Sequence, residues 1–211
     1  MVGRLPGSTL GWVRRYRVVS FTVRNGHEIL QIARGQKMEL REALKEQYHA
    51  GLAMLAECVE KCPPGLWIEG QYPRRYWRIA FHAAFFTHLY LGQKEEAFEP
   101  WPARKEGVDH GLWQQPPDVE PYELPEEALV YTRVEILDYI RFVDALIDPT
   151  VDRLNLEADE TGFHWYPNMS KLSHELMNIR HLQGHVGQLS ELLMAAQVDT
   201  RWVARSSGLS N

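Results

Sequence analysis

Two histidines, His181 and His185, are the residues whose type and spacing point most directly to chemistry in this chain. Side chains four positions apart lie on one face of a helix, with their Cβ atoms about 5 to 6 Å from each other. Both imidazoles can then reach one metal ion at about 2.1 Å. Because the chain contains nine histidines, a pair at this spacing also arises by chance, so the pair gains weight only from the helix that carries it.

The segment that carries this pair is predicted to be a proline-free helix from an N-cap at Ser170 to about Ala196. An apolar stripe runs along it, with a line of polar residues beside the stripe. Burying imidazole and amide groups there costs free energy unless they are hydrogen-bonded or bind a ligand. His174 falls on the same stripe, but a rise of about 1.5 Å per residue places it roughly 10 Å from His181, too far to share one ion. The stripe consists of Leu182, Val186, Leu189 and Leu193, and the mostly polar line beside it of Asn178, His181, His185, Gln188 and Leu192.

A third ligand must come from another helix, and the aromatic segment before Gly92 offers His82 and His88. The two are six residues apart and face different sides, and His82 is the better candidate. Three neutral imidazoles with one open position are typical of catalytic metal sites, whereas structural sites are usually closed by four protein ligands. We therefore predict a divalent metal ion, Zn, Ni, Fe or Mn, on His82, His181 and His185. The alternative is that these histidines are hydrogen-bonded core residues without a metal.

Four helical segments must position these residues, and they account for most of the chain. Apolar residues recur at helical spacing in each segment, with proline, glycine, serine or acidic residues at the ends. The stretch between the second and third segments holds five prolines and resists regular structure. Four long helices and almost no strand signal predict an all-α four-helix bundle. The segments run from Met38 to about Lys61, from Pro73 to Leu91 with Gly92 as cap, from Pro125 to Pro149, and from Ser170 to about Ala196.

The first 37 residues differ in composition from the rest of the chain. They hold seven basic residues and one acid and so carry +6, whereas the remainder carries −11 of a total of −5. An alternating run from Tyr16 to Val23 is the only strand-like signal. We expect residues 1–37 to be a basic extension that is either sequence upstream of the fold, a targeting peptide or an edge strand. The bundle is assigned to residues 38–200 and a C-terminal tail to residues 201–211.

Composition argues against several classes of function. The acidic body lacks the clustered Lys and Arg on which nucleic-acid surfaces depend. No apolar run reaches the roughly 18 residues needed to cross a bilayer, since the longest, Ile79 to Leu91, is interrupted by histidine and threonine. Cys58 and Cys62 are too few for the disulfide framework of a small secreted domain, and side chains on one rigid helix are poorly aimed for a bridge. We expect a cytoplasmic protein without nucleic-acid or membrane partners.

The segments that carry the histidines resemble those of the DinB-like superfamily. The resemblance covers Met38 to about Ala196, and it implies a metal-dependent four-helix bundle whose ligands are His82, His181 and His185. Members often have two adjacent histidines at or near the second motif, where this chain has Gly184 before His185. The motifs that carry the resemblance are Trp77-x-x-x-x-His82, Leu89-Tyr90-Leu91, and Asn178-Ile179-Arg180-His181-x-x-x-His185-x-Gly187-Gln188-Leu189.

The resemblance implies two classes of function. The first is a metal-dependent thiol S-transferase, or a related hydrolase or isomerase, in which the ion binds a low-molecular-weight thiol as thiolate for attack on a small electrophilic substrate. The second is a non-catalytic metal- or ligand-binding bundle of a stress response. Apolar bundle faces of this kind also favour a homodimer. Residues that could contact the substrate are Trp101, Trp113, Trp165 and Tyr166 as pocket walls and Arg78 as partner of a carboxylate. The simpler alternative is loop packing for the four aromatic residues and a solvated charge for Arg78.

Overall fold

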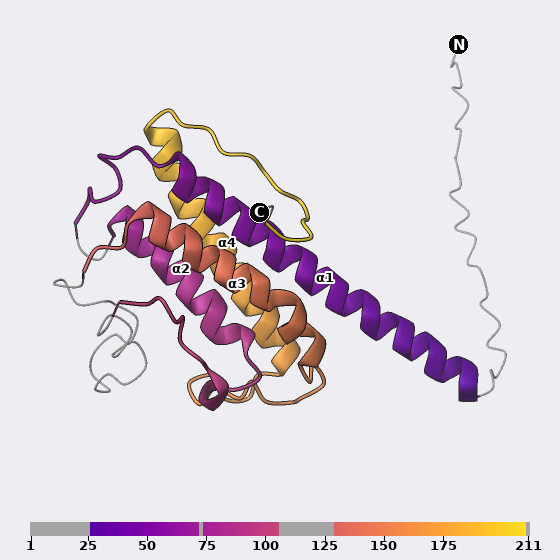
Figure 1. Cartoon of the computed structure of the whole chain (residues 1–211). Coiled ribbons are helices and arrows are strands. Elements are labelled where there is room, and N and C mark those ends of the chain that lie inside the picture. Colours follow the sequence, from indigo (N-terminus) through magenta and orange to yellow (C-terminus); the bar gives the residue numbers. More distant parts are fainter. Residues whose placement is uncertain (1–25, 72–73, 106–128, 210–211) are drawn as a thin grey trace, which may run out of the picture. The chain divides into compact units, whose positions relative to one another are not determined.

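The computed structural model describes residues 26–71, 74–105 and 129–209, with side chains from residue 39 onward. Within these ranges the chain forms four α-helices, one short 3-10 helix and no strand, which confirms the all-α prediction (Figure 1). The elements are α1 (Gly26–Lys61), α2 (Tyr76–Leu91), η1 (Glu95–Ala97), α3 (Arg133–Arg153) and α4 (Lys171–Ala195).

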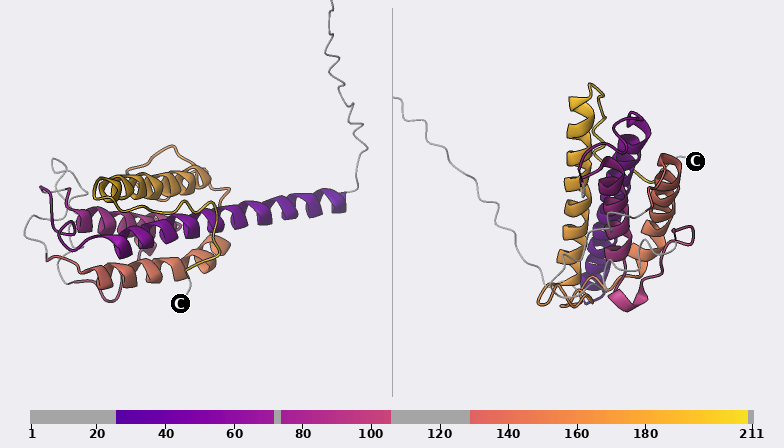
Figure 2. Two further views of the ribbon diagram at one scale, coloured as in Figure 1. Left: turned by 90° about the horizontal axis from the view of Figure 1, so that it is seen from above. Right: turned by 90° about the vertical axis from the view of Figure 1, so that its left-hand side faces the viewer.

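The four helices run in an up-down-down-up order (Figure 2). α2 runs back along α1, and α3 also begins beside the end of α1, where the Arg133 guanidinium donates to the Cys62 carbonyl at 2.8 Å. α4 begins beside the end of α2, where the Lys171 ammonium donates to the Gly92 carbonyl. α1 is therefore parallel to α4, and α2 is parallel to α3. The connection between α2 and α3 joins opposite ends of the bundle.

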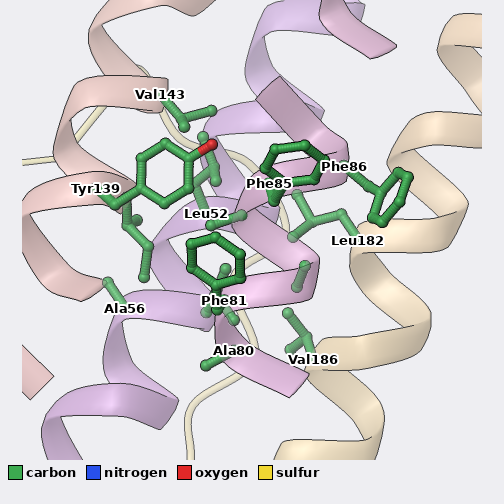
Figure 3. Packing of buried hydrophobic residues seen from close by; sticks show 14 of the residues in the cluster. Leu52, Ala56, Ala80, Phe81, Phe85, Phe86, Tyr139, Val143, Leu182 and Val186 are labelled. Carbon is green, nitrogen blue, oxygen red and sulfur yellow. The ribbon is translucent and has the colours of Figure 1, made fainter. Parts of the chain in front are cut away.

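Aromatic and aliphatic side chains from all four helices form one core (Figure 3). α2 contacts α3 on one side and α4 on another and is buried on nearly all sides. Its Phe81 stacks on Tyr131 with ring centroids 4.8 Å apart, and Trp77 is fully buried. Large aromatic rings bury about 150 to 250 Å² each and dominate the energetics of a core. Figure 3 also shows Leu52 and Ala56 of α1, Ala80, Phe85 and Phe86 of α2, Tyr139 and Val143 of α3, and Leu182 and Val186 of α4.

The start of α3 differs from the prediction. The segment Pro125–Glu127 lies outside the described residues, but residues 129–132 are not helical. The helix begins at Arg133 because Thr132 forms a reciprocal cap with Glu135. The Thr132 hydroxyl accepts from the Glu135 amide at 3.2 Å, and the Glu135 carboxylate accepts from the Thr132 amide at 2.6 Å. This capping box satisfies two backbone donors at once.

The end of α3 also lies beyond the predicted stop. Pro149 stands inside the helix, which continues to Arg153, although proline lacks the amide for one helical hydrogen bond. The last turn is tied to α1 instead. The Arg41 guanidinium donates to the carbonyls of Val151 and, at 2.7 Å, of Leu154. These charged hydrogen bonds hold the final turn in helical form despite the proline.

The starts of α1 and α2 follow the sequence less closely than their C-terminal ends. The backbone of α1 is helical from Gly26, so the predicted start at Met38 is too late; no proline breaks the intervening residues. Compact packing nevertheless divides the chain between residues 36 and 37. α2 ends at Leu91 as predicted, but Gly92 is extended with φ −68° and forms no left-handed cap. Pro73 and Tyr16 to Val23 lie outside the described residues.

No described helix is apolar over a length sufficient to cross a bilayer.

The bounds of α4 agree with the prediction. The Ser170 side chain accepts from the amide of Ser173 at 3.3 Å, as expected of an N-cap. This cap fixes the register of the helix that carries two of the three predicted ligands.

The C-terminal residues pack against α1 and α3. The Leu209 amide donates to the Asp144 carboxylate of α3 at 2.9 Å. The other oxygen of this carboxylate lies 2.6 Å from Nδ1 of the buried His49 of α1, and Nε2 of His49 lies 3.1 Å from Asp148. A charged cluster therefore holds the segment that the sequence assigns to a tail.

This cluster should make stability depend on pH. Burial has the largest effect and lowers the pKa of His49, but hydrogen bonds and charges from Asp144 and Asp148 together outweigh it and raise the pKa. The resulting stabilisation is complete below the unfolded-state value of about 6.5 and is lost as the pH rises through the raised folded-state value. Urea unfolding at pH 6 and pH 8 should show a smaller pH-dependent loss for His49→Gln than for the wild type. Equal losses in both proteins would contradict this prediction.

Candidate metal centre

His82, His181 and His185 come together where α2 contacts α4. Nε2 of His181 lies 3.2 Å from Nε2 of His82 and 3.0 Å from Nε2 of His185. The three ligand atoms all lie within 4.8 Å of one another, and the three side chains are half-buried. Three nitrogens bound tetrahedrally to one ion at about 2.1 Å would be roughly 3.4 Å apart. The observed separations are close to that value.

Local packing places each histidine at the edge of the core. Leu182 and Val186, each one residue after a histidine of α4, are fully buried. Since successive helical residues are rotated by about 100°, the preceding histidines lie at the margin of the buried stripe. His82 follows the core residue Phe81 on α2 in the same way. The three imidazoles therefore meet at the rim of the α2–α4 contact.

Burial keeps the imidazoles of α4 in the neutral form that binds metals. Burial, helped by the neighbouring His185, lowers the pKa of His181 to about 4. Burial also lowers the pKa of His185, although its hydrogen bond to Gln188 acts in the opposite direction. Nδ1 of His185 lies 2.8 Å from Oε1 of Gln188. Because an amide oxygen only accepts, Nδ1 of His185 donates and its Nε2 presents a lone pair to the centre.

The residues present fit a divalent cation. Imidazole nitrogens suit Zn, Ni and Fe, and neutral histidines supply lone pairs without charge repulsion. Lone pairs of Nε2 atoms this close repel one another unless a proton or a cation lies between them. A cation is the arrangement in which all three Nε2 atoms can present lone pairs at once. His82, His181 and His185 are the residues that would hold it.

Two further buried histidines face other parts of the bundle. Nδ1 of His88 lies 3.1 Å from the Tyr139 hydroxyl of α3, and burial lowers the pKa of His88 to about 4. His174 stacks on Phe163 with ring centroids 4.8 Å apart. Neither histidine belongs to the group formed by the three ligand candidates.

Two aromatic side chains of α2, Phe86 and Tyr90, border the histidines, and the sequence did not assign either of them to the site. Phe86 lies 4.6 Å from the His82 ring and 5.7 Å from the His181 ring, centroid to centroid. Tyr90 lies 6.4 Å from the His181 ring and 5.7 Å from Tyr166. Phe86 and Tyr90 follow His82 at intervals of four residues, which places all three on one face of the helix. This spacing could have predicted their position beside the histidines. Tyr166 thus reaches the centre through Tyr90.

The other described residues proposed to contact a substrate have different partners. Trp101 stacks on Tyr139 of α3 at 4.7 Å, which agrees with the loop packing that the sequence left open for it. Trp165 packs against the ring of Phe163. Trp113 lies outside the described residues. Arg78 is buried, with its guanidinium 5.5 Å from the ring of the preceding tryptophan, and is not a solvated charge.

The two cysteines are buried and form no disulfide. Burial raises the pKa of both thiols, that of Cys62 to about 11. The thiolate is the reactive form of cysteine, so these groups are small core side chains, as the sequence favoured.

No protein-family model matches this chain, and no curated protein or solved structure is significantly similar to it. Within the described residues, the fold and the site define an all-helical protein of four helices that brings three histidines together at one point. The resemblance to the DinB-like superfamily is carried by the motifs alone and stays a prediction.

Proposed function

We propose that this protein is a DinB-like, divalent-metal-binding protein that acts as a metal-dependent thiol S-transferase, or a related hydrolase or isomerase, on a small molecule. The observation that carries the proposal is the convergence of His82, His181 and His185, whose ligand atoms lie within 4.8 Å of one another. A bound divalent ion would supply Lewis acidity that favours the thiolate form of a coordinated thiol at neutral pH.

The three histidines would leave a coordination position for a ligand from outside the chain. In the part of the chain that the structure describes, no fourth histidine, cysteine or acidic residue joins the group. The side chains are half-buried, so one side of the group is open to solvent. Sites with three protein ligands and an open position are typical of catalysis.

The surrounding residues supply an apolar border and two hydroxyl groups. The ring of Phe86 shields His82 and His181 from water on the α2 side. The hydroxyls of Tyr90 and Tyr166 lie 3.5 Å apart, and each can donate to or accept from a polar substrate. These groups would orient a small substrate beside the thiol.

Two measurements on untagged protein test this proposal. Elemental analysis after gentle purification should give about one divalent ion per chain. Protein loaded with Zn²⁺, Ni²⁺ or Mn²⁺ should then consume a low-molecular-weight thiol in the presence of an electrophile, and a chelator should stop the reaction. A metal content near zero would defeat the metal site, and bound metal without thiol consumption would remove the transferase.

A second candidate function is a non-catalytic metal-binding bundle in a stress response. The observation that favours it is that the histidines come from two helices, His82 from α2 and the other two from α4. An ion there would cross-link α2 to α4, and metal binding of that kind contributes directly to folding. The fold of a variant without His181 distinguishes the two candidates.

A further inference from the structure

Two buried polar atoms without hydrogen-bond partners lie one helical turn apart on α4. They are Nδ1 of His181 and Oδ1 of Asn178. Side chains three positions apart are neighbours on a helix surface. Buried polar atoms in folded proteins nearly always have a partner, so each exception calls for a physical explanation.

The orientation of Asn178 is set by α2. Its side chain is fully buried, and Nδ2 donates to the Thr87 carbonyl at 3.1 Å. Because the nitrogen of an amide donates and the oxygen accepts, this bond determines which end of the carboxamide is the acceptor. Oδ1 is therefore an acceptor that lacks a donor.

His181 has the complementary need. Its Nε2 lies 3.2 Å from Nε2 of His82 and 3.0 Å from Nε2 of His185. If Nε2 presents its lone pair to an ion, the proton of the neutral ring is on Nδ1. Nδ1 of His181 is then a donor that lacks an acceptor, one turn from an acceptor that lacks a donor.

We propose that Asn178 is the positioning residue for His181, an inference that rests on the metal site proposed above. Oδ1 of Asn178 accepts a hydrogen bond from one buried water, which in turn accepts from Nδ1–H of His181. A single water is the usual bridge between buried polar groups that do not touch. The bridge holds the imidazole in the tautomer whose Nε2 lone pair faces His82 and His185.

His185 provides a comparison within the same helix. Its Nδ1 is bonded directly to Oε1 of Gln188 at 2.8 Å, so each ligand from α4 has an amide oxygen one turn away. Gln188 is exposed, and bulk water can replace it. Asn178 is fully buried, so its loss leaves the bridging water without an acceptor that bulk water could replace. Hydrogen bonds to metal-bound histidines of this kind change metal affinity by 10- to 100-fold.

Three variants test the proposal. Asn178→Leu keeps the branched shape but removes the acceptor and should weaken Zn²⁺ binding by about 10- to 100-fold in competition with a coloured chelator. Asn178→Asp keeps an acceptor and should hold the Zn²⁺ affinity near that of the wild type or increase it. Gln188→Ala, the matched control at the exposed amide, should lose less affinity than Asn178→Leu.

Imidazole ¹⁵N spectra of the Zn²⁺-loaded protein give a second readout. The Nδ1 proton of His181 should exchange slowly with solvent in the wild type and faster in Asn178→Leu, because the bridging water has lost its acceptor. A merely structural role would lower the melting temperature and leave both the exchange rate and the Zn²⁺ affinity unchanged, which would overturn the proposal. If Asn178→Leu does not fold, Asn178→Ala, which also lacks an acceptor, gives the same readouts.

The two proposals fail in different ways. A wild type that binds no Zn²⁺ contradicts the proposed function and with it the role of Asn178. Zn²⁺ binding that is equally tight in the wild type and in Asn178→Leu contradicts only the role of Asn178.

Discussion

Replacing His181 with alanine should abolish metal binding, from about one ion per chain to none. His181 is the central ligand, because its Nε2 lies within 3.2 Å of the Nε2 atoms of both His82 and His185. The two histidines that remain, His82 and His185, come from different helices and offer only two nitrogen ligands. Elemental analysis after dialysis measures the loss directly. At a ligand concentration of 100 times the dissociation constant, wild-type protein should also gain about 2.7 kcal/mol of stability that the variant does not gain.

The matched control for this experiment is His164→Ala. His164 is exposed and bonded to Glu95 at 2.7 Å, away from the three-histidine group. This variant should keep its ion. Metal retained by His181→Ala would contradict the site.

The fold of His181→Ala separates the two candidate functions. The neighbouring Leu182 is fully buried and stays in place, so we expect the variant to fold without metal, as suits a catalytic site. A variant that unfolds without its ion would favour the non-catalytic, structural role.

Replacing Glu175 with glutamine should lower the free energy of unfolding by about 3 to 5 kcal/mol, because it leaves a buried charge unpaired. Glu175 and Lys171 are both fully buried, and their charged atoms lie 3.0 Å apart. The Tyr48 hydroxyl donates to the other carboxylate oxygen at 2.7 Å. Burial lowers the pKa of Lys171, and the charge of Glu175 opposes that effect. Urea unfolding of the variant and the wild type measures the loss.

Two comparisons show whether the lost charge is the cause. Lys171→Met combined with Glu175→Leu should recover most of the stability, since replacing both members of a buried pair by apolar residues is often neutral or stabilising. Asp138→Asn breaks an exposed pair with Arg141 at 2.9 Å and should cost at most about 1 kcal/mol. A loss in Glu175→Gln as small as in Asp138→Asn would contradict the prediction. The stability of Glu175→Gln should also rise at high pH, where Lys171 loses its proton in both states.

Features that depend on neighbouring residues could be predicted from the sequence. The bounds of α4 follow from the N-cap at Ser170 and from an uninterrupted helical period. His181 and His185 share a face because four residues make about one turn. The separation of His174 from the other two follows from the helical rise. In each case the information lies within a few positions along the chain.

Competing local signals produced the errors at α3. Pro125 and the acids after it are typical of a helix start, but the reciprocal cap of Thr132 and Glu135 sets the start at Arg133. The stop predicted at Pro149 is also wrong, because Arg41 of α1 binds the carbonyls of the last turn. A guanidinium more than 100 positions away cannot be read from the local pattern.

The amino-acid sequence by itself determined four helical segments, the apolar stripe of α4 and the pair of histidines on that helix, because these depend on helical periodicity and end signals. Packing of the helices decided which side chains meet: His82 with His181 across 99 positions, Trp101 with α3, and a buried Lys171 with a buried Glu175. Composition alone would leave that lysine and glutamate in water. The partner of a side chain depends on which faces of distant helices come together, and the free energy that selects those faces is spread over the whole core.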